Sequence, residues 1–204
     1  MATLIHEKSG VNTLNNMADF KQAYNITMAH EGGYANDKAD TGGETWKGIA
    51  RNKNPKWSGW TVVDEYRGKS GFPDNLNSAP GLQELVLLFY KKEFWDPLNL
   101  DSVNDQPIAN EMFDTGVNMG QGIAATFLQR AINIANRAGK DYADIKVDGA
   151  IGGKTVEVLN ASADQKLILK LLNILQGSRY ISICENNPTQ ERFLRSWMSR
   201  VSAY

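Results

Sequence analysis

The segment from residue 18 to residue 49, ADFKQAYNITMAHEGGYANDKADTGGETWKGI, decides the fold of this chain. Its first part places apolar or aromatic residues at Phe20, Tyr24 and Met28, the spacing of one helix face, and ends at the diglycine of residues 32–33. The part that follows is rich in glycine, aspartate and threonine, which is typical of tight turns between short strands. The segment therefore predicts a helix over residues 18–31 that leads directly into a glycine-turned β-hairpin.

The rest of the chain carries helical patterns with glycine or proline at their borders. They predict helices at residues 61–67, 80–95, 107–118, 121–138, 153–161, 164–186 and 188–202. The hairpin is the only sheet that the sequence indicates. We therefore predict a mainly α protein of the α+β class, with one small β-hairpin.

The composition excludes several classes of function. With 204 residues, 42% hydrophobic and 22% charged, the chain has the make-up of a globular protein. A net charge of −1 provides no general basic surface for nucleic acid. The longest unbroken apolar run, residues 85–90, is far too short to span a membrane. We therefore expect no nucleic-acid partner and no membrane span.

Cofactor chemistry has few possible ligands in this sequence. Cys184 is the only cysteine, and His6 and His30 are the only histidines, so one chain offers neither a disulfide nor a zinc site. A calcium loop within residues 32–49 is a further possibility, but that segment lacks the regular spacing of acidic ligands. We expect no cofactor and no metal.

Glu31 is the first candidate for chemistry. It continues the apolar face of the predicted first helix and stands at the carboxyl end of that helix. Partial burial and the negative end of the helix dipole both disfavour a charged carboxylate, so both should raise the pKa of Glu31 toward that of a general acid. The alternative is a solvated glutamate at a frayed helix end.

A second set of carboxylates follows in the glycine-rich segment, at Asp37, Asp40 and Glu44. Glycoside hydrolysis uses two carboxyl groups, one that protonates the leaving oxygen and one that stabilises or attacks from the opposite face of the sugar. The spacing permits such a pair with Glu31. The alternative is that Asp and Gly here serve only the turns of the hairpin.

The motif formed by these residues resembles a known family. Residues 31–34 read Glu-Gly-Gly-Tyr and residues 40–49 read Asp-Thr-Gly-Gly-Glu-Thr-Trp-Lys-Gly-Ile, which is similar to the E-G-G-Y…D-x-G-G-x-T-x-x-G-I signature of glycoside hydrolase family 108. That family contains N-acetylmuramidases related to phage endolysins, and some members are labelled secretion activator proteins. The resemblance implies a lysozyme-like fold and cleavage of the β-1,4 bond between N-acetylmuramic acid and N-acetylglucosamine. It also implies that Glu31 is the catalytic acid, and we expect Asp40 to be its partner.

The second half of the chain resembles the peptidoglycan-binding region that follows this hydrolase in the family. The similar pieces are residues 113–120, 127–131, 147–155 and 193–200. The expected organisation is an N-terminal tail at 1–17, a hydrolase region at 18–105 and a helical peptidoglycan-binding-like region at 106–204, packed on the hydrolase.

Six further side chains are candidates for contacts with the substrate. Asp114 and Asn118 lie four residues apart on one predicted helix face, where a local hydrogen bond between them is an equal alternative. Aromatic residues can stack on sugars, although most aromatic residues build cores. The expected substrate-binding residues are Tyr34, Thr45, Tyr90, Trp95, Asp114 and Asn118.

Two other functions stay open on the sequence. A lytic transglycosylase also needs a single acid/base glutamate, and a non-catalytic peptidoglycan-binding or secretion-regulating protein could keep the fold without the activity. We expect a monomer that acts on peptidoglycan glycan strands. Residues 1–17 show no conventional export signal, so we expect synthesis in the cytoplasm and action on the cell wall after release.

Overall fold

The computed structural model describes residues 17–29, 32–36 and 42–201. The helices follow the predicted pattern. Their bounds are α1 Phe20–Met28, α2 Gly59–Arg67, α3 Leu82–Tyr90, α4 Gln106–Met119, α5 Gln121–Ala135, α6 Gly153–Ala161, α7 Gln165–Asn186 and α8 Glu191–Met198. The mainly α fold with a small sheet is confirmed.

Side-chain caps explain where several helices begin. Asp19, Asp105 and Asp164 each accept a hydrogen bond from a backbone N–H three residues later, at the starts of α1, α4 and α7. Such a cap satisfies one of the donors that a helix start leaves free.

The sheet has one strand more than the predicted hairpin. Strands β1 Tyr34–Ala35, β2 Thr45–Trp46 and β3 Ile49–Ala50 pair antiparallel in the order β1-β2-β3. Tyr34 lies opposite Trp46, and Trp46 lies opposite Ile49. Each strand has only two residues, so the ladder alone cannot hold the sheet, and side chains outside the strands must fix it.

The predicted helix over residues 80–95 is interrupted. α3 ends at Tyr90, and the chain continues through a π-helical turn, η2 Lys91–Trp95. Short 3₁₀ turns follow at η3 Asp96–Leu98 and η4 Leu100–Ser102, and two others occur at η1 Asp74–Ser78 and η5 Pro188–Gln190. The wider π turn carries Trp95 into the core, where the side chain is fully buried.

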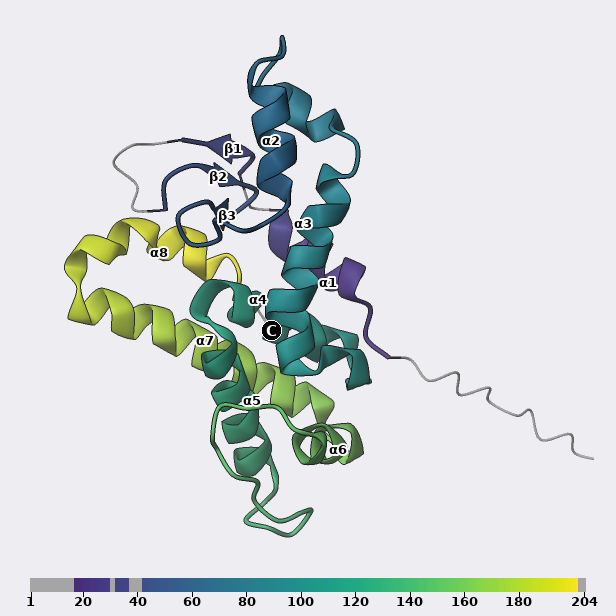
Figure 1. The fold of residues 1–204 in the computed structure, drawn as a ribbon. Helices are drawn as coiled ribbons and strands as arrows, with labels where there is room; N and C mark the ends of the chain where they lie inside the picture. Colours follow the sequence, from purple (N-terminus) through teal and green to yellow (C-terminus); the bar gives the residue numbers. More distant parts are fainter. Residues whose placement is uncertain (1–16, 30–31, 37–41, 202–204) are drawn as a thin grey trace, which may run out of the picture.

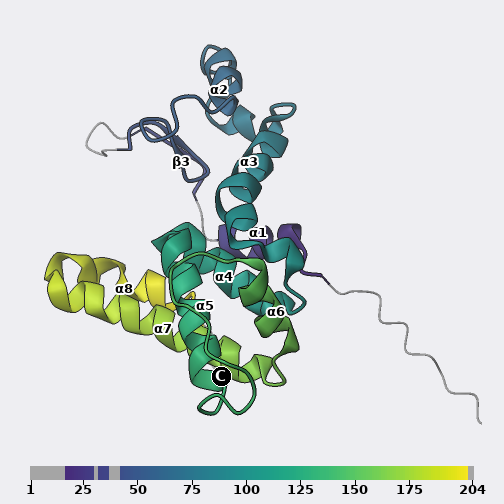
Figure 2. The same ribbon diagram turned by 60° about the horizontal axis from the view of Figure 1, so that its bottom comes forward.

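In space, the sheet lies beside α2 and α3 at one end of the molecule, and α4, α5, α7 and α8 gather at the other end (Figures 1 and 2). The first helix, α1, lies between them and packs on α4. An aromatic cluster joins these elements, with the Phe20 ring centroid 5.5 Å from that of Trp95 and 5.7 Å from that of Phe113. The C-terminal α7 and α8 are held together by the stacked rings of Tyr180 and Trp197.

Within the described residues, no helix has both the length and the apolar character that a bilayer crossing requires.

Candidate active site

Two predicted catalytic residues, Glu31 and Asp40, and the alternative Asp37 lie outside the described residues. Ala29 and Gly32, on either side of residues 30–31, are described. Ala29 caps the end of α1, and Ala29 and Gly32 both line a hollow of about 250 Å³ together with Tyr24, Lys47 and Gln83. Ala29 and Gly32, the described residues nearest to Glu31 in sequence, therefore both border this hollow.

A second hollow, of about 440 Å³, lies next to the turn between β2 and β3. Gly48 lines this hollow, whereas its neighbour Lys47 lines the first one, so the turn borders both. Two of the predicted substrate-binding residues, Tyr90 and Asn118, line the second hollow. The Tyr90 hydroxyl donates to the backbone carbonyl of Lys47 over 2.9 Å, which ties α3 to the turn.

Glu93 lines the same hollow and was not selected from the sequence. It lies three residues after Tyr90, and its side chain is exposed. The i, i+3 spacing from Tyr90 is the signal that could have identified it. The hollow thus contains one carboxylate with access to solvent.

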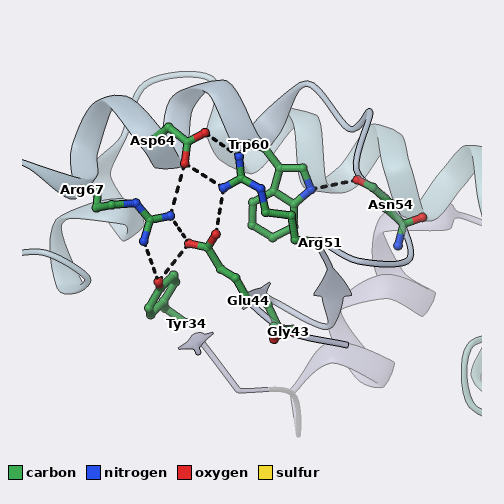
Figure 3. Close-up of polar contacts among 9 residues, drawn as sticks. Tyr34, Gly43, Glu44, Arg51, Asn54, Trp60, Asp64 and Arg67 are labelled. Atoms are coloured by element: carbon green, nitrogen blue, oxygen red, sulfur yellow. Dashed lines mark hydrogen bonds and ion pairs between the residues drawn. The ribbon is translucent and has the colours of Figure 1, made fainter. Parts of the chain in front are cut away.

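Glu44 has a structural environment that the sequence did not predict. Its carboxylate accepts hydrogen bonds from the Tyr34 hydroxyl at 2.9 Å, from Arg51 at 2.8 Å and from Arg67 (Figure 3). Asp64 on α2 pairs with both arginines, at 2.6 Å for Arg51 and 3.2 Å for Arg67. These contacts tie the sheet to α2, and we call Glu44, Arg51, Asp64, Arg67 and Tyr34 the hairpin clamp.

The electrostatics of the hairpin clamp keep both carboxylates ionised. Burial alone would raise the pKa of Glu44, but the hydrogen bonds from Arg51, Tyr34 and Arg67 outweigh burial and leave its pKa lowered. The hydrogen bonds from Arg51 are the main cause that lowers the pKa of Asp64 to about 2. Glu44 is therefore a buried anion between two arginines and is poorly suited to give or take a proton near neutral pH.

The other motif residues also have local partners. The Tyr34 ring packs edge-on against Phe72, with centroids 4.8 Å apart, and its hydroxyl belongs to the hairpin clamp. The half-buried Thr45 donates its hydroxyl hydrogen to the carbonyl of Gly43 at 3.2 Å. Both side chains support the sheet in this structure, and a contact with substrate stays a prediction.

Trp95 presents no surface to a ligand. Its side chain is 0% exposed, and its indole N–H donates to Asp101 at 2.7 Å. The surrounding contacts, with Phe20 and Phe113, are those of a core residue. In this structure Trp95 packs the core instead of lining the predicted sugar site.

Asp114 is largely enclosed at the junction of α1, α4 and α7. It is 9% exposed and forms a 2.9 Å ion pair with Arg200, and it accepts a hydrogen bond from Gln176 at 3.0 Å. Asn118 donates to the Asp114 carbonyl at 2.8 Å, which is the local hydrogen bond that the sequence offered as the alternative to a contact with substrate. Burial raises the pKa of Asp114, and Arg200, Gln176 and the neighbouring Thr27 of α1 partly offset this effect. Asp114 therefore joins the C-terminal segment to α4.

Taken together, the geometry defines a class of protein: a mainly α, lysozyme-like fold in which a helix ends beside a small sheet bordered by two hollows. The comparisons with known proteins agree with this class. Residues 24–120 match the family model described as "Glycosyl hydrolase 108", and residues 123–202 match the model described as "Predicted Peptidoglycan domain". The first match supports a glycoside hydrolase for the N-terminal half of the chain, and the second supports a peptidoglycan domain for the C-terminal half.

Among similar solved structures, one that matches over most of its length is a SagA protein. "Structure of Brucella abortus SagA" has a TM-score of 0.56 and 20% sequence identity, and the match covers 89% of this chain and 88% of that chain. At this identity the likeness concerns the fold alone. The comparison with curated proteins gave no match.

The hairpin clamp can be tested by replacing Glu44 with Gln. The change leaves the partly exposed Arg51 and Arg67 with Asp64 as their only anion within the described residues, and the loss of charge-assisted hydrogen bonds to Glu44 should cost about 1–2 kcal/mol of unfolding free energy. Urea unfolding of Glu44→Gln should show this loss. The exposed Glu65→Gln on α2 is the matched control and should unfold like the wild type. Equal stability of Glu44→Gln and wild type would show that the clamp does not hold the sheet.

Glu111, a buried residue of α4, should make the free energy of unfolding depend on pH. Burial, and secondarily the charge of Asp114, raises the pKa of Glu111 from 4.5 to about 8. Between these values the native state keeps a proton that the unfolded chain has lost. This group therefore lowers the unfolding free energy by about 1.4 kcal/mol for each pH unit from pH 4.5 up to pH 8.

Glu111→Gln should remove that dependence and flatten the curve of unfolding free energy against pH. Chemical unfolding at pH 5, 6, 7 and 8 measures it, and the exposed Glu185→Gln on α7 serves as the control. Parallel curves for Glu111→Gln and wild type would mean that Glu111 is ionised in the native protein.

Proposed function

We propose that this protein hydrolyses the β-1,4 bond between N-acetylmuramic acid and N-acetylglucosamine in peptidoglycan, with Glu31 as the general acid. The observation that carries the proposal is the match of residues 24–120 to glycosyl hydrolase 108, because this segment contains Glu31 within its Glu-Gly-Gly-Tyr motif. The second match, to a peptidoglycan domain, supports peptidoglycan as the substrate.

The described geometry supports a site between α1 and the sheet. Ala29 and Gly32, on either side of residues 30–31, line one hollow, and the β2–β3 turn, α3 and α4 line the next. Clefts of this kind, with a few polar groups, are where ligands bind. In the proposed reaction Glu31 protonates the glycosidic oxygen, and water completes the cleavage at the sugar carbon.

Ion pairs in the structure reduce the number of candidates for the second catalytic carboxylate. Glu44 is bound by two arginines and Asp114 by Arg200, so neither is free to face a developing positive charge on the sugar. Of the carboxylates first considered, Asp37 and Asp40 stay as candidates, and the exposed Glu93 joins them. We propose Asp40, in the motif itself, as the partner of Glu31.

Glu31→Gln tests the assignment of the acid. The amide keeps the size of the side chain but has no transferable proton, and general acid catalysis is worth about 10²–10⁴-fold in rate. The clearing of purified cell walls should fall by at least this factor while circular dichroism shows a folded protein. Glu65→Gln, which is remote in sequence and exposed, is the control for loss of a glutamate charge. A folded Glu31→Gln protein that clears walls at the wild-type rate would refute the role.

Asp40→Asn tests the partner through the pH profile. A neighbouring anion holds Glu31 protonated, so its removal should lower the pKa of Glu31 and shift the alkaline limb of kcat/KM to lower pH. The acidic limb should move or vanish if Asp40 must be ionised. A profile identical to that of the wild type would point instead to Asp37 or Glu93.

A further inference from the structure

A third hollow, of about 470 Å³, lies in the C-terminal half, where the loop after α5 meets the start of α6. This loop is at the end of the molecule away from the sheet in both views (Figures 1 and 2). The lining includes Tyr142, Ile145, Lys146, Ala150, Lys154 and Thr155. Its volume is within the range of small-ligand sites, and it is separate from the two hollows beside the sheet.

Side chains of α5 hold the loop in a fixed shape. Gln129, which is 1% exposed, donates to the Asp148 carboxylate and to the Ala150 carbonyl, both at 2.9 Å, and accepts from the backbone N–H of Asp148 and of Gly149. One turn later, Asn133 binds both the carbonyl and the N–H of Ile145. The wall of the hollow is therefore formed before any ligand arrives, which lowers the entropic cost of binding.

The start of α6 supplies hydrogen-bond donors at this hollow. α6 begins at Gly153 after Gly152, and no side chain caps its first turn. Thr155, in that turn, lines the hollow and is 6% exposed, and the described part of the chain gives its hydroxyl no hydrogen-bond partner. An uncapped helix start together with the unpartnered Thr155 hydroxyl in the wall favours a ligand with acceptor oxygens and negative charge.

Two exposed lysines stand at the rim of the hollow, beside two carboxylates. The Lys146 and Lys154 side chains are 84% and 70% exposed, and their ion pairs, with Asp148 at 3.7 Å and Glu157 at 3.1 Å, are of the weak exposed kind. The carboxylates of Asp144 and Asp148 accept hydrogen bonds inside the loop, from the neutral amides of Asn136 and Gln129, which fix their positions without cancelling their charge. Ala143, Ile145, Ala150 and Val158 give the hollow an apolar wall.

We propose that this hollow binds the stem peptide of peptidoglycan, with a stem carboxylate at the α6 start and alanine methyl groups against the apolar wall. The proposal rests on the proposed function in that it takes peptidoglycan as the substrate. Stem peptides are short and carry free carboxylates and alanine side chains, which match both surfaces. A neutral sugar matches them less well, since Tyr142 is the one aromatic residue in the lining and its hydroxyl is already bound to the Ile132 carbonyl at 3.0 Å.

The test is calorimetric titration of the whole chain with a synthetic tetrapeptide, L-Ala–γ-D-Glu–meso-diaminopimelate–D-Ala. Lys146→Gln and Lys154→Gln should each weaken binding about threefold to fivefold, and the double variant about tenfold or more, as expected for exposed ion pairs. Thr155→Val keeps the shape of the side chain, and loss of its hydrogen bond should weaken binding about fivefold. Lys166→Gln, an exposed lysine on α7, is the matched control and should bind like the wild type.

Three results would overturn the proposal: no binding of the tetrapeptide at millimolar concentration, equal binding by the double variant and the wild type, or lysine-dependent binding of a peptide-free glycan oligomer in its place. The outcome is separable from that of the hydrolase assay. Wild-type protein that binds the tetrapeptide through the lysines but leaves glycan strands intact would keep this site and refute the proposed hydrolysis. Wild-type protein that cleaves glycan strands but does not bind the tetrapeptide would refute this site alone.

Discussion

The carboxylate of Glu44 between Arg51 and Arg67 is the interaction on which the arrangement of the candidate active site depends. Three strands of two residues each cannot form a stable sheet by their own ladder. The hairpin clamp replaces the missing strand length with charge-assisted hydrogen bonds to α2, and the Tyr90 hydroxyl adds a tie from α3 to the β2–β3 turn. Because that turn borders both hollows, their shape follows from these contacts.

The two halves of the chain share a single core around α4. α4 packs on α1 through the aromatic cluster and on α5 and α7 on its other sides. The buried pair of Asp114 and Arg200 then connects α4 to residues near the C-terminal end of the described chain. The C-terminal half is thus part of the support of α1, the helix that precedes Glu31, as well as the region with the proposed stem-peptide hollow.

The helices were predictable because each has an apolar face and a local start or stop signal, such as Asp105 before α4 or the glycines before α6. The π turn at residues 91–95 was not, because the core contacts of Trp95 in this turn are with Phe20 and Phe113, which are distant in sequence. The third strand of the sheet was not predicted, since strands of two residues carry no alternating pattern.

The candidate site was predictable only in part. The motif with Glu31 and Asp40 is recognised by its spacing, but the roles of Glu44 and Asp114 depend on arginines that lie 7 and 23 residues from Glu44 and 86 residues from Asp114. The sequence identifies these carboxylates as candidates but does not indicate which arginine pairs with each of them in the folded chain. Tyr90 and Asn118, by contrast, do line one hollow together, from helices that only the folded chain brings side by side.

The central claim is that water cleaves a muramyl bond in this site. The most direct measurement is mass spectrometry of the fragments released from purified peptidoglycan in ¹⁸O-labelled water. The account predicts fragments that end in reducing N-acetylmuramic acid and carry one ¹⁸O atom at the new reducing end. Unlabelled fragments that end in anhydro-muramic acid would contradict hydrolysis and identify a lytic transglycosylase, and intact glycan strands would contradict the enzymatic account itself.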